Sequence, residues 1–362
     1  PFPFLNFNST TMLRKIFLST SVFFGFISAN AQTDSAKTSP APTITGSVDA
    51  YYRFNFNDPP SSSNLNNYTS FTNSQNSFEL GMASIRADHT FGKASATIDL
   101  GFGRRAEEFS YANPDHPTLF AVKQAFLSYS VSDKLKFTMG KWMTHIGYEV
   151  TDAYLNRNYS MDYMFSYGPF SHTGIRADIV IGKKSGLMFG VANETDNVTT
   201  NASPKYLIAQ YSTGTTNDKV KFYLNYQGSY NYAFSKTQFD VVLTGTVTNK
   251  FSVGYNGTIQ SYAPKGESAN SWWGSAVYLN LDPTSIFGIT LRGEYFDDQK
   301  AIVFAPGTSV FDLTLSPNFK INNLTIIPEL RFDDAQKEIF EKSDGSAIKS
   351  TLTGILAATY HF

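Results

Sequence analysis

The stretch TLTGILAATYHF, residues 351–362, alternates in a way that decides the fold. One face is apolar or aromatic, and it comprises Leu352, Leu356, Ala358, Tyr360 and Phe362. The other face is mostly threonine together with His361. A strand at the end of a chain is usually a free edge, and free edges aggregate unless they are paired or covered. Because closing a barrel pairs the last strand with the first, the stretch predicts a closed antiparallel β-barrel.

The composition of the 362-residue chain fits either a soluble protein or a barrel. The hydrophobic fraction is 41% and the mean hydropathy is −0.23, which are too low for a helical membrane protein. Aromatic residues make up 15% of the chain, with 32 Phe and 21 Tyr, as aromatic girdles at two membrane interfaces would require. An aromatic-rich soluble β-sandwich or lectin has a similar composition and remains the alternative at this level.

Two further features of the composition exclude classes of function. The chain has no cysteine, so disulfides, thiolate zinc sites, thiol catalysis and lipidation on cysteine are excluded. The formal net charge is −1, which gives no reason to expect a nucleic-acid partner.

The N-terminal region has the three parts of a secretory signal. Arg14 and Lys15 precede a mostly apolar run over 16–27, and Ala29-Asn30-Ala31 is a cleavage site of the A-x-A type. We therefore expect an upstream, non-native segment at 1–11, a signal peptide at 12–31, a polar linker at 32–42 and a barrel domain at 43–362. An uncleaved anchor is the alternative, but the apolar run is short for a membrane span.

From residue 43 onward the pattern has period two, which is typical of strands facing two environments. We predict about sixteen strands, an even number as in single-chain bacterial barrels. They fall near 43–54, 77–90, 92–103, 119–131, 134–141, 171–182, 185–193, 204–212, 218–228, 236–247, 250–260, 271–281, 284–296, 308–319, 322–332 and 351–362.

The connections between these strands alternate between short and long. Tight turns at 91–92, 132–133, 183–184, 248–249, 282–283 and 321–322 are interleaved with long loops at 55–76, 104–118, 142–170, 194–203, 261–270, 297–307 and 333–350. Transmembrane barrels have short periplasmic turns and long extracellular loops. A soluble sandwich has no reason to keep this alternation, so the spacing favours an outer-membrane barrel.

Charged residues recur as i, i+2 pairs on one face of the predicted strands. The pairs are Arg86 with Asp88, Arg176 with Asp178, Arg292 with Glu294, and Glu329 with Arg331. The first two belong to a repeated tetrapeptide, Ile-Arg-Ala-Asp, at 85–88 and 175–178. Charges on the lipid face are costly, so we expect these pairs to point inward, where a barrel of sixteen strands holds water. Salt bridges that merely neutralise one another are the alternative.

The longest internal loop, 142–170, is the third predicted extracellular loop and a candidate constriction. It carries Glu149, Asp152, Arg157 and Asp162. If the loop folds into the lumen, its acidic groups are expected to face basic residues on the wall and to create a transverse field that filters ions. The candidate basic residues are Arg86, Arg104, Arg105 and Arg176. A surface loop packed over the barrel mouth is the alternative.

This part of the chain also resembles a known family. The motifs are Gly140-Lys141-Trp142, Gly147-Tyr148-Glu149, Asn158-Tyr159-Ser160, Pro169-Phe170 and His172-Thr173-Gly174-Ile175-Arg176. Together they resemble the OmpL-like β-barrel porins of diderm bacteria, a likeness that covers most of 43–362. The resemblance implies a porin-like barrel in the bacterial outer membrane and supplies no catalytic residues.

The expected function is a passive aqueous channel for small hydrophilic solutes or ions, which needs no cofactor. The alternative is a non-conducting outer-membrane barrel that binds or scaffolds a partner. Standard zinc, serine-hydrolase and phosphate-loop signatures are missing, so we expect no enzyme, although a triad formed across strands is an alternative. The expected partners are outer-membrane lipid, the permeating solutes, and the barrel assembly machinery, which reads a C-terminal aromatic signal like Tyr360-His361-Phe362. A homotrimer would match classical porins.

Overall fold

The computed structural model describes residues 39–110, 117–200, 204–231 and 233–362. The predicted upstream segment at 1–11 and the predicted signal peptide at 12–31 lie outside the described residues, as does most of the predicted linker at 32–42. Residues 41–362 form one unit, which contains every strand.

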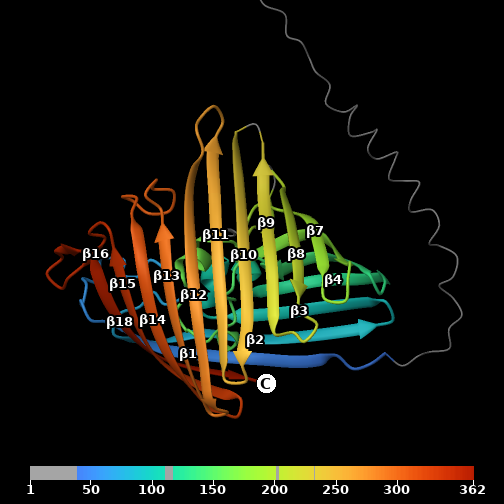
Figure 1. Ribbon diagram of the computed structural model, residues 1–362, viewed down its shortest axis with the longest axis horizontal. Coiled ribbons are helices and arrows are strands. Elements are labelled where there is room, and N and C mark those ends of the chain that lie inside the picture. Colours follow the sequence, from blue (N-terminus) through green and yellow to red (C-terminus); the bar gives the residue numbers. More distant parts are fainter. Residues whose placement is uncertain (1–38, 111–116, 201–203, 232) are drawn as a thin grey trace, which may run out of the picture. The chain divides into compact units, whose positions relative to one another are not determined.

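Sixteen antiparallel strands close into a barrel, as Figure 1 shows. They are β1 (Thr43–Asn55), β2 (Ser77–Phe91), β3 (Ala94–Phe102), β4 (Val122–Ser132), β5 (Leu135–Met143), β6 (Ser171–Val180), β7 (Gly186–Ala192), β8 (Tyr206–Gly214), β9 (Val220–Tyr230), β10 (Phe234–Thr248), β11 (Phe251–Pro264), β12 (Asn270–Thr284), β13 (Phe287–Asp297), β14 (Ser309–Ile321), β15 (Leu324–Ala335) and β18 (Ser350–His361). The two-residue strands β16 (Phe340–Glu341) and β17 (Ala347–Ile348) form a separate small hairpin. The predicted fold class and strand number are confirmed.

The barrel closes where the sequence predicts, between the first strand and the last. β1 pairs antiparallel with β18 from Ser47 opposite His361 to Asn55 opposite Thr353. At the end of this seam, the backbones of Gly46 and Phe362 exchange two hydrogen bonds of 3.0 Å. A Cβ at Gly46 would lie 2.6 Å from the Phe362 ring, so only glycine allows this close approach.

The two faces of the wall differ as alternation requires. Phe239, Ile259 and Leu279 point outward and are 53%, 45% and 39% exposed, whereas their inward-facing neighbours are buried polar residues. An apolar outer surface and a polar interior are what a barrel needs when lipid surrounds it.

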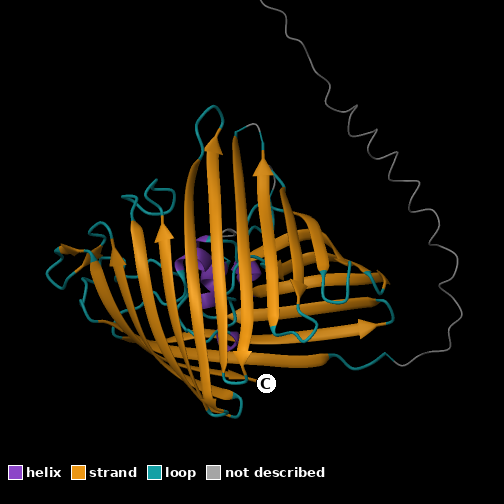
Figure 2. Cartoon of the chain, in the orientation of Figure 1, coloured by secondary structure: helices purple, strands orange, loops and turns teal. Residues whose placement is uncertain are grey.

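The helices of the described residues are short and lie in the long connections. They are α2 (Arg104–Phe109), η1 (Pro117–Ala121), η2 (Ala153–Leu155) and α3 (Tyr163–Tyr167), and Figure 2 draws them in purple among the strands. Among the described residues, no helix combines the length and apolar character needed to cross a membrane. The tight turns join strands at one end of the barrel, and the longer connections lie mostly at the other, as predicted. The exception is the connection between β9 and β10, residues 231–233, which is short although it lies at the end of the long loops.

Candidate functional site

The loop between β5 and β6, residues 144–170, contacts the inner face of the barrel. Gly147 N donates to Asp240 on β10 at 3.1 Å, and Asn158 Nδ2 donates to Ser316 on β14 at 2.7 Å. The Tyr159 hydroxyl donates to Asp49 on β1 at 2.6 Å. Since these wall residues belong to strands far apart around the barrel, the loop crosses the lumen.

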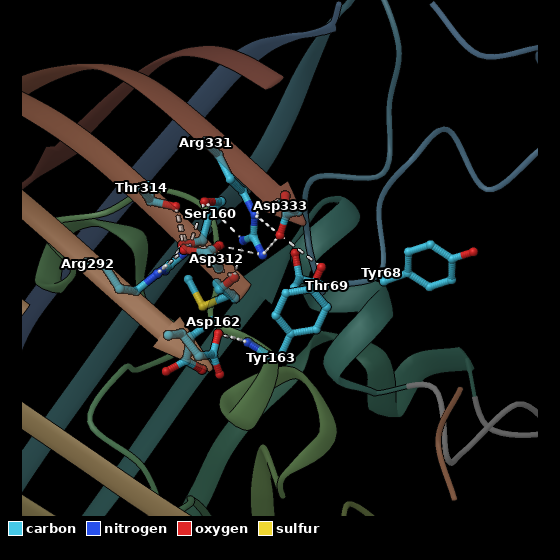
Figure 3. A network of polar contacts seen from close by, with 12 residues as sticks. Tyr68, Thr69, Ser160, Asp162, Tyr163, Arg292, Asp312, Thr314, Arg331 and Asp333 are labelled. Carbon is cyan, nitrogen blue, oxygen red and sulfur yellow. Dashed lines mark hydrogen bonds and ion pairs between the residues drawn. The ribbon is translucent and has the colours of Figure 1, made fainter. Parts of the chain in front are cut away.

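Arg292 on β13 holds the centre of the loop (Figure 3). Its Nη1 donates to Glu149 Oε1 and to the Ser160 carbonyl, both at 2.7 Å. Its Nη2 lies 3.2 Å from Asp312 Oδ2 on β14. The Arg292 side chain is completely buried. A buried guanidinium is tolerated only when its donors and its charge are matched, and here two carboxylates and a carbonyl match them.

Arg331 on β15, two strands away from β13, also binds a loop carbonyl and wall carboxylates. Its Nη1 donates to the Met161 carbonyl at 2.6 Å, and its Nη2 lies 2.7 Å from Asp312 and 2.8 Å from Asp333. The guanidinium carbon stands 5.1 Å from the centre of the Tyr163 ring. Asp312 therefore joins both arginines into one buried network, which Figure 3 shows beside the loop.

Two wall carboxylates satisfy the backbone N–H groups of the loop. Glu329 accepts from Tyr159 N at 2.7 Å and from Ser160 N at 3.0 Å. Glu294 accepts from Tyr163 N at 2.7 Å and from Met164 N at 2.9 Å, at the start of α3. These are charge-assisted bonds, and they bind N–H groups that would otherwise be buried without partners.

Helix α3 also has a partner within the loop. Asp162, at its N-terminal cap, accepts from Phe165 N at 2.6 Å and receives the Tyr278 hydroxyl at 2.6 Å. Asp162 is thus bound to the helix start and to β12, and it does not face a basic wall residue among those predicted.

The expectation that all four charged pairs line water is wrong for two of them. Arg292 and Glu294 are completely buried, and Glu329 and Arg331 are only 5% and 4% exposed. The physical reason is that the loop fills the space in front of them and takes up their charges.

The other two pairs do reach solvent. Arg86 and Asp88 on β2 have side chains 37% and 38% exposed, and their nearest atoms are 2.6 Å apart. Arg176 and Asp178 on β6 are 22% and 31% exposed, and Lys136 on β5 lies 3.9 Å from Asp178. These residues form two charged, solvent-accessible places on the wall, one on β2 and one on β5 and β6.

Arg157 lies in a second solvent-accessible place, between the loop and β12. It binds Asp282 at 2.9 Å, and Lys320 on β14 binds the same carboxylate at 2.9 Å. A recess of about 220 Å³ adjoins it, lined by loop residues and by Tyr278, Asn280 and Thr290 of the wall.

The basic partners predicted for the loop are largely incorrect. Arg104 and Arg105 lie in α2, and not on a strand. Arg105 is buried over the Phe71 ring at 4.6 Å, where its Nη1 donates to the Thr151 carbonyl at 3.3 Å. Glu149 faces Arg292 instead, a residue 143 positions away.

Asp152 pairs with Lys123 at 2.7 Å, and Lys123 also binds Asp99 at 3.0 Å. Sequence reasoning missed both Lys123 and Asp99 as parts of the site. The register between β3 and β4 shifts beside Asp99, so simple alternation does not reveal which way Lys123 points.

The described residues contain no group of three or more His, Asp or Glu side chains able to hold a metal ion. The charged groups bind one another, the loop or solvent. This arrangement can orient and filter charged solutes, and it contains no assembled set of groups for metal chemistry.

Comparison with known proteins places this geometry among channels. The family model described as "Putative beta-barrel porin-2, OmpL-like" matches residues 42–362. No curated protein matches the chain.

Several solved structures share the fold at low sequence identity. The anion-selective porin of Comamonas acidovorans is 9% identical, with a TM-score of 0.59 over 89% of this chain and 99% of that one. The outer-membrane channel DcaP of Acinetobacter baumannii is 12% identical, with a TM-score of 0.58 over 91% and 99%. The trimer form of OmpT from Vibrio cholerae is 10% identical, with a TM-score of 0.56 over 89% and 100%.

Proposed function

The chain belongs to the OmpL-like β-barrel porin family, and from this premise we propose a passive aqueous channel for small hydrophilic solutes or ions, narrowed by the loop at 142–170. As a family member it is a β-barrel channel of the bacterial outer membrane. The size of the passage and the choice of solute depend on how the loop sits in the lumen.

The observation that carries the proposal is the unequal exposure of the inner wall. Most of the loop's bonds to the wall go to β10–β15 and β1, where Arg292, Glu294, Asp312, Glu329 and Arg331 are buried. Asp282 on β12 and Lys320 on β14 are partly exposed exceptions there. The pairs on β2 and β6 remain solvent-accessible, whereas Asp99, Lys123 and Lys141 on the strands between them are buried. We therefore place the passage between the loop and the β2–β6 wall. Mixed charges along such a passage would create the transverse field expected of a selective pore.

A second candidate, a non-conducting barrel that binds a partner, is favoured by one observation. Inward-facing side chains on many strands are buried, including Asp99, Trp142, Asn225, Tyr278 and Arg292. A barrel filled in this way could serve as a rigid scaffold that displays its extracellular loops.

Planar-bilayer recording of the refolded full chain tests the two candidates. A channel gives discrete single-channel steps, and deletion of residues 150–165 should increase their size because the obstruction is removed. If neither protein conducts while both remain folded and heat-modifiable on gels, the channel proposal fails and the scaffold remains.

We also propose a homotrimer. The similarity to a trimeric structure supports it, as does an apolar groove of about 570 Å³ on the outer face of β5–β9. Phe137, Ile175, Phe189 and Leu207 line the groove, which includes β7, the shortest wall strand. Chemical cross-linking in outer membranes should give a trimer band, and charged substitutions at Phe189 should remove it.

We further propose that residues 12–31 are a signal peptide and that export leaves Gln32 as the first residue. The positive region, the apolar run and the A-x-A site support this reading. N-terminal sequencing of the protein extracted from outer membranes is the test, and a retained apolar run would contradict it.

A further inference from the structure

Four side chains with polar nitrogens gather on the inner face where β5, β6 and the start of the loop meet. Trp142 lies on β5, His172 and Arg176 on β6, and His145 in the loop. The two imidazole rings are 5.0 Å apart, and Trp142 lies 6.4 Å from His172. The Arg176 guanidinium stands 5.0 Å from the Trp142 ring centre. The four residues form one contiguous cluster, of which the channel proposed above uses only Arg176.

Each of the four has a buried nitrogen with no hydrogen-bond partner among the described residues. These atoms are Trp142 Nε1, His145 Nδ1, His172 Nδ1 and Arg176 Nε. Trp142 and His172 are each only 2% exposed. Buried polar atoms without partners are rare and costly, so such a cluster implies a group that the protein itself does not supply.

The chemistry of the donors restricts what that group can be. The indole N–H and the guanidinium N–H can only donate, so neither can bind a cation. His145 Nε2 donates to the Tyr226 carbonyl at 3.2 Å, which leaves its Nδ1 as an acceptor. A ligand of this cluster must therefore present acceptor oxygens to Trp142 and Arg176, and a protonated oxygen of the ligand can donate to His145 Nδ1.

Comparison of the two copies of the repeated tetrapeptide shows that Arg176, unlike Arg86, does not use its Nε in a hydrogen bond with the aspartate of its own copy. In the first copy, Arg86 Nε and Nη2 donate to Asp88 at 2.6 and 2.9 Å, so that guanidinium is occupied by its own carboxylate. In the second copy, Arg176 Nε is 3.4 Å from Asp178 and forms no hydrogen bond there. Instead the guanidinium lies over Trp142, and its 22% exposed side chain links the cluster to solvent.

Charges of both signs surround the cluster. β5 contributes Lys136 and the buried Lys141, while β6 contributes Arg176 and Asp178. Two further carboxylates lie close by, since Asp196 accepts from Ser171 N at 2.7 Å and Asp240 accepts from Asn225 at 2.7 Å. The choice of an anion therefore rests on the donors of Trp142 and Arg176 and not on the net charge around them.

We propose that Trp142, Arg176 and the two histidines form a binding site for the oxyanion group of a solute, a carboxylate or a phosphate, inside the lumen. This proposal rests on the proposed channel function in one respect, namely that solutes reach the site through the lumen. It gives the passage along β2–β6 a step at which anionic solutes are held before they cross.

The test measures binding to the refolded full chain in detergent, with inorganic phosphate and acetate as separate probes and chloride at equal ionic strength as the reference. We expect saturable thermal stabilisation by at least one probe. Saturable stabilisation by phosphate alone would indicate phosphate recognition, and saturable stabilisation by acetate alone would indicate carboxylate recognition. W142F should weaken binding about tenfold through loss of one hydrogen bond to a charged group, and R176M should abolish it.

The matched control is R86M, which alters the same position of the first tetrapeptide and should leave binding unchanged. Circular dichroism and heat-modifiability on gels establish that each variant is folded. If the four nitrogens bind only water, neither probe will stabilise the protein saturably, and this result would overturn the proposal. Equal losses of probe binding in R86M and R176M would also overturn it. A barrel that binds phosphate or acetate without conducting would instead refute the channel and leave the site standing.

Discussion

The pairs Arg292–Glu294 and Arg86–Asp88 follow the same i, i+2 pattern, yet they differ in burial and in the groups that they bind. On β13 both members are completely buried, and each binds the loop rather than the other. On β2 the arginine binds the aspartate, and both are more than a third exposed. Alternation along a strand thus decides which face a charge occupies. Whether that charge meets water depends on a segment more than a hundred residues away.

The difference between the two walls reflects what the loop requires. A backbone placed inside a barrel brings N–H and carbonyl groups that need partners. The β13–β15 wall supplies both kinds, since Glu329 accepts from loop N–H groups and Arg331 donates to a loop carbonyl. On β2 and β6 the members of each charged pair lie close to each other along one strand and reach solvent, and among the described residues of β2–β6 only Lys123 on β4 forms an ion pair with the loop.

The largest expected effect comes from Arg292→Met. The substitution leaves Glu149 buried without its cationic partner and leaves Asp312 with Arg331 alone. Breaking a buried pair in this way typically costs about 3–5 kcal/mol. We expect the loop to detach, which would lower the unfolding midpoint and expose the loop to proteolysis. Arg86→Met is the control. An unchanged midpoint for Arg292→Met would remove the distinction between the walls.

A smaller effect is expected for Glu329→Gln, which retains size but loses charge and one acceptor. Glu329 accepts from two loop N–H groups and from the Ser316 hydroxyl. The substitution should destabilise the docked loop by about 1–3 kcal/mol, as for other hydrogen bonds to charged groups. Urea unfolding in detergent measures it, with Glu79→Gln on β2 as the comparison. Equal effects of the two variants would contradict the contrast.

Acid should loosen the start of the loop. Burial lowers the pKa of His145 to about 4, whereas the unfolded chain has an ordinary value near 6.5. The unfolded state then binds more protons between these values, so the contribution of His145 to stability is complete above pH 6.5 and is lost toward pH 4. We expect a loss of about 1–3 kcal/mol, measured as unfolding at pH 7 and pH 4.5. His145→Asn should reduce the dependence.

The smallest effect on stability is expected for Arg86→Met, at most about 0.5 kcal/mol, because exposed pairs contribute little. Its effect should appear in selectivity instead. The substitution leaves Asp88 without its cation beside the proposed passage, so reversal potentials in a salt gradient should shift toward cations. An unchanged reversal potential for Arg86→Met would place the passage away from β2.

Much of the barrel was predictable, because its signals are local. The alternation around Phe239 and Ile259, the alternation of short and long connections, and the aromatic strand at 351–362 all lie within short windows. The contacts of the loop were not predictable in this way. Glu149 and Arg292 are both charged and both on plausible inward positions, but nothing in either local pattern pairs them across 143 positions. Lys123 was missed because a register shift breaks the alternation beside it.

The seam between β1 and β18 also sets an order of events during folding. Arg53 and Thr353, which lie on its two sides, are 300 positions apart in the sequence. Neighbouring hairpins can form early from local contacts, but this pairing must wait until both ends of the barrel chain are present. The loop needs Asp49 from the first strand and Glu329 from β15, so it acquires its full set of partners only as the cylinder shuts. We therefore expect the docked loop and the β1–β18 seam to become stable in the same step of folding.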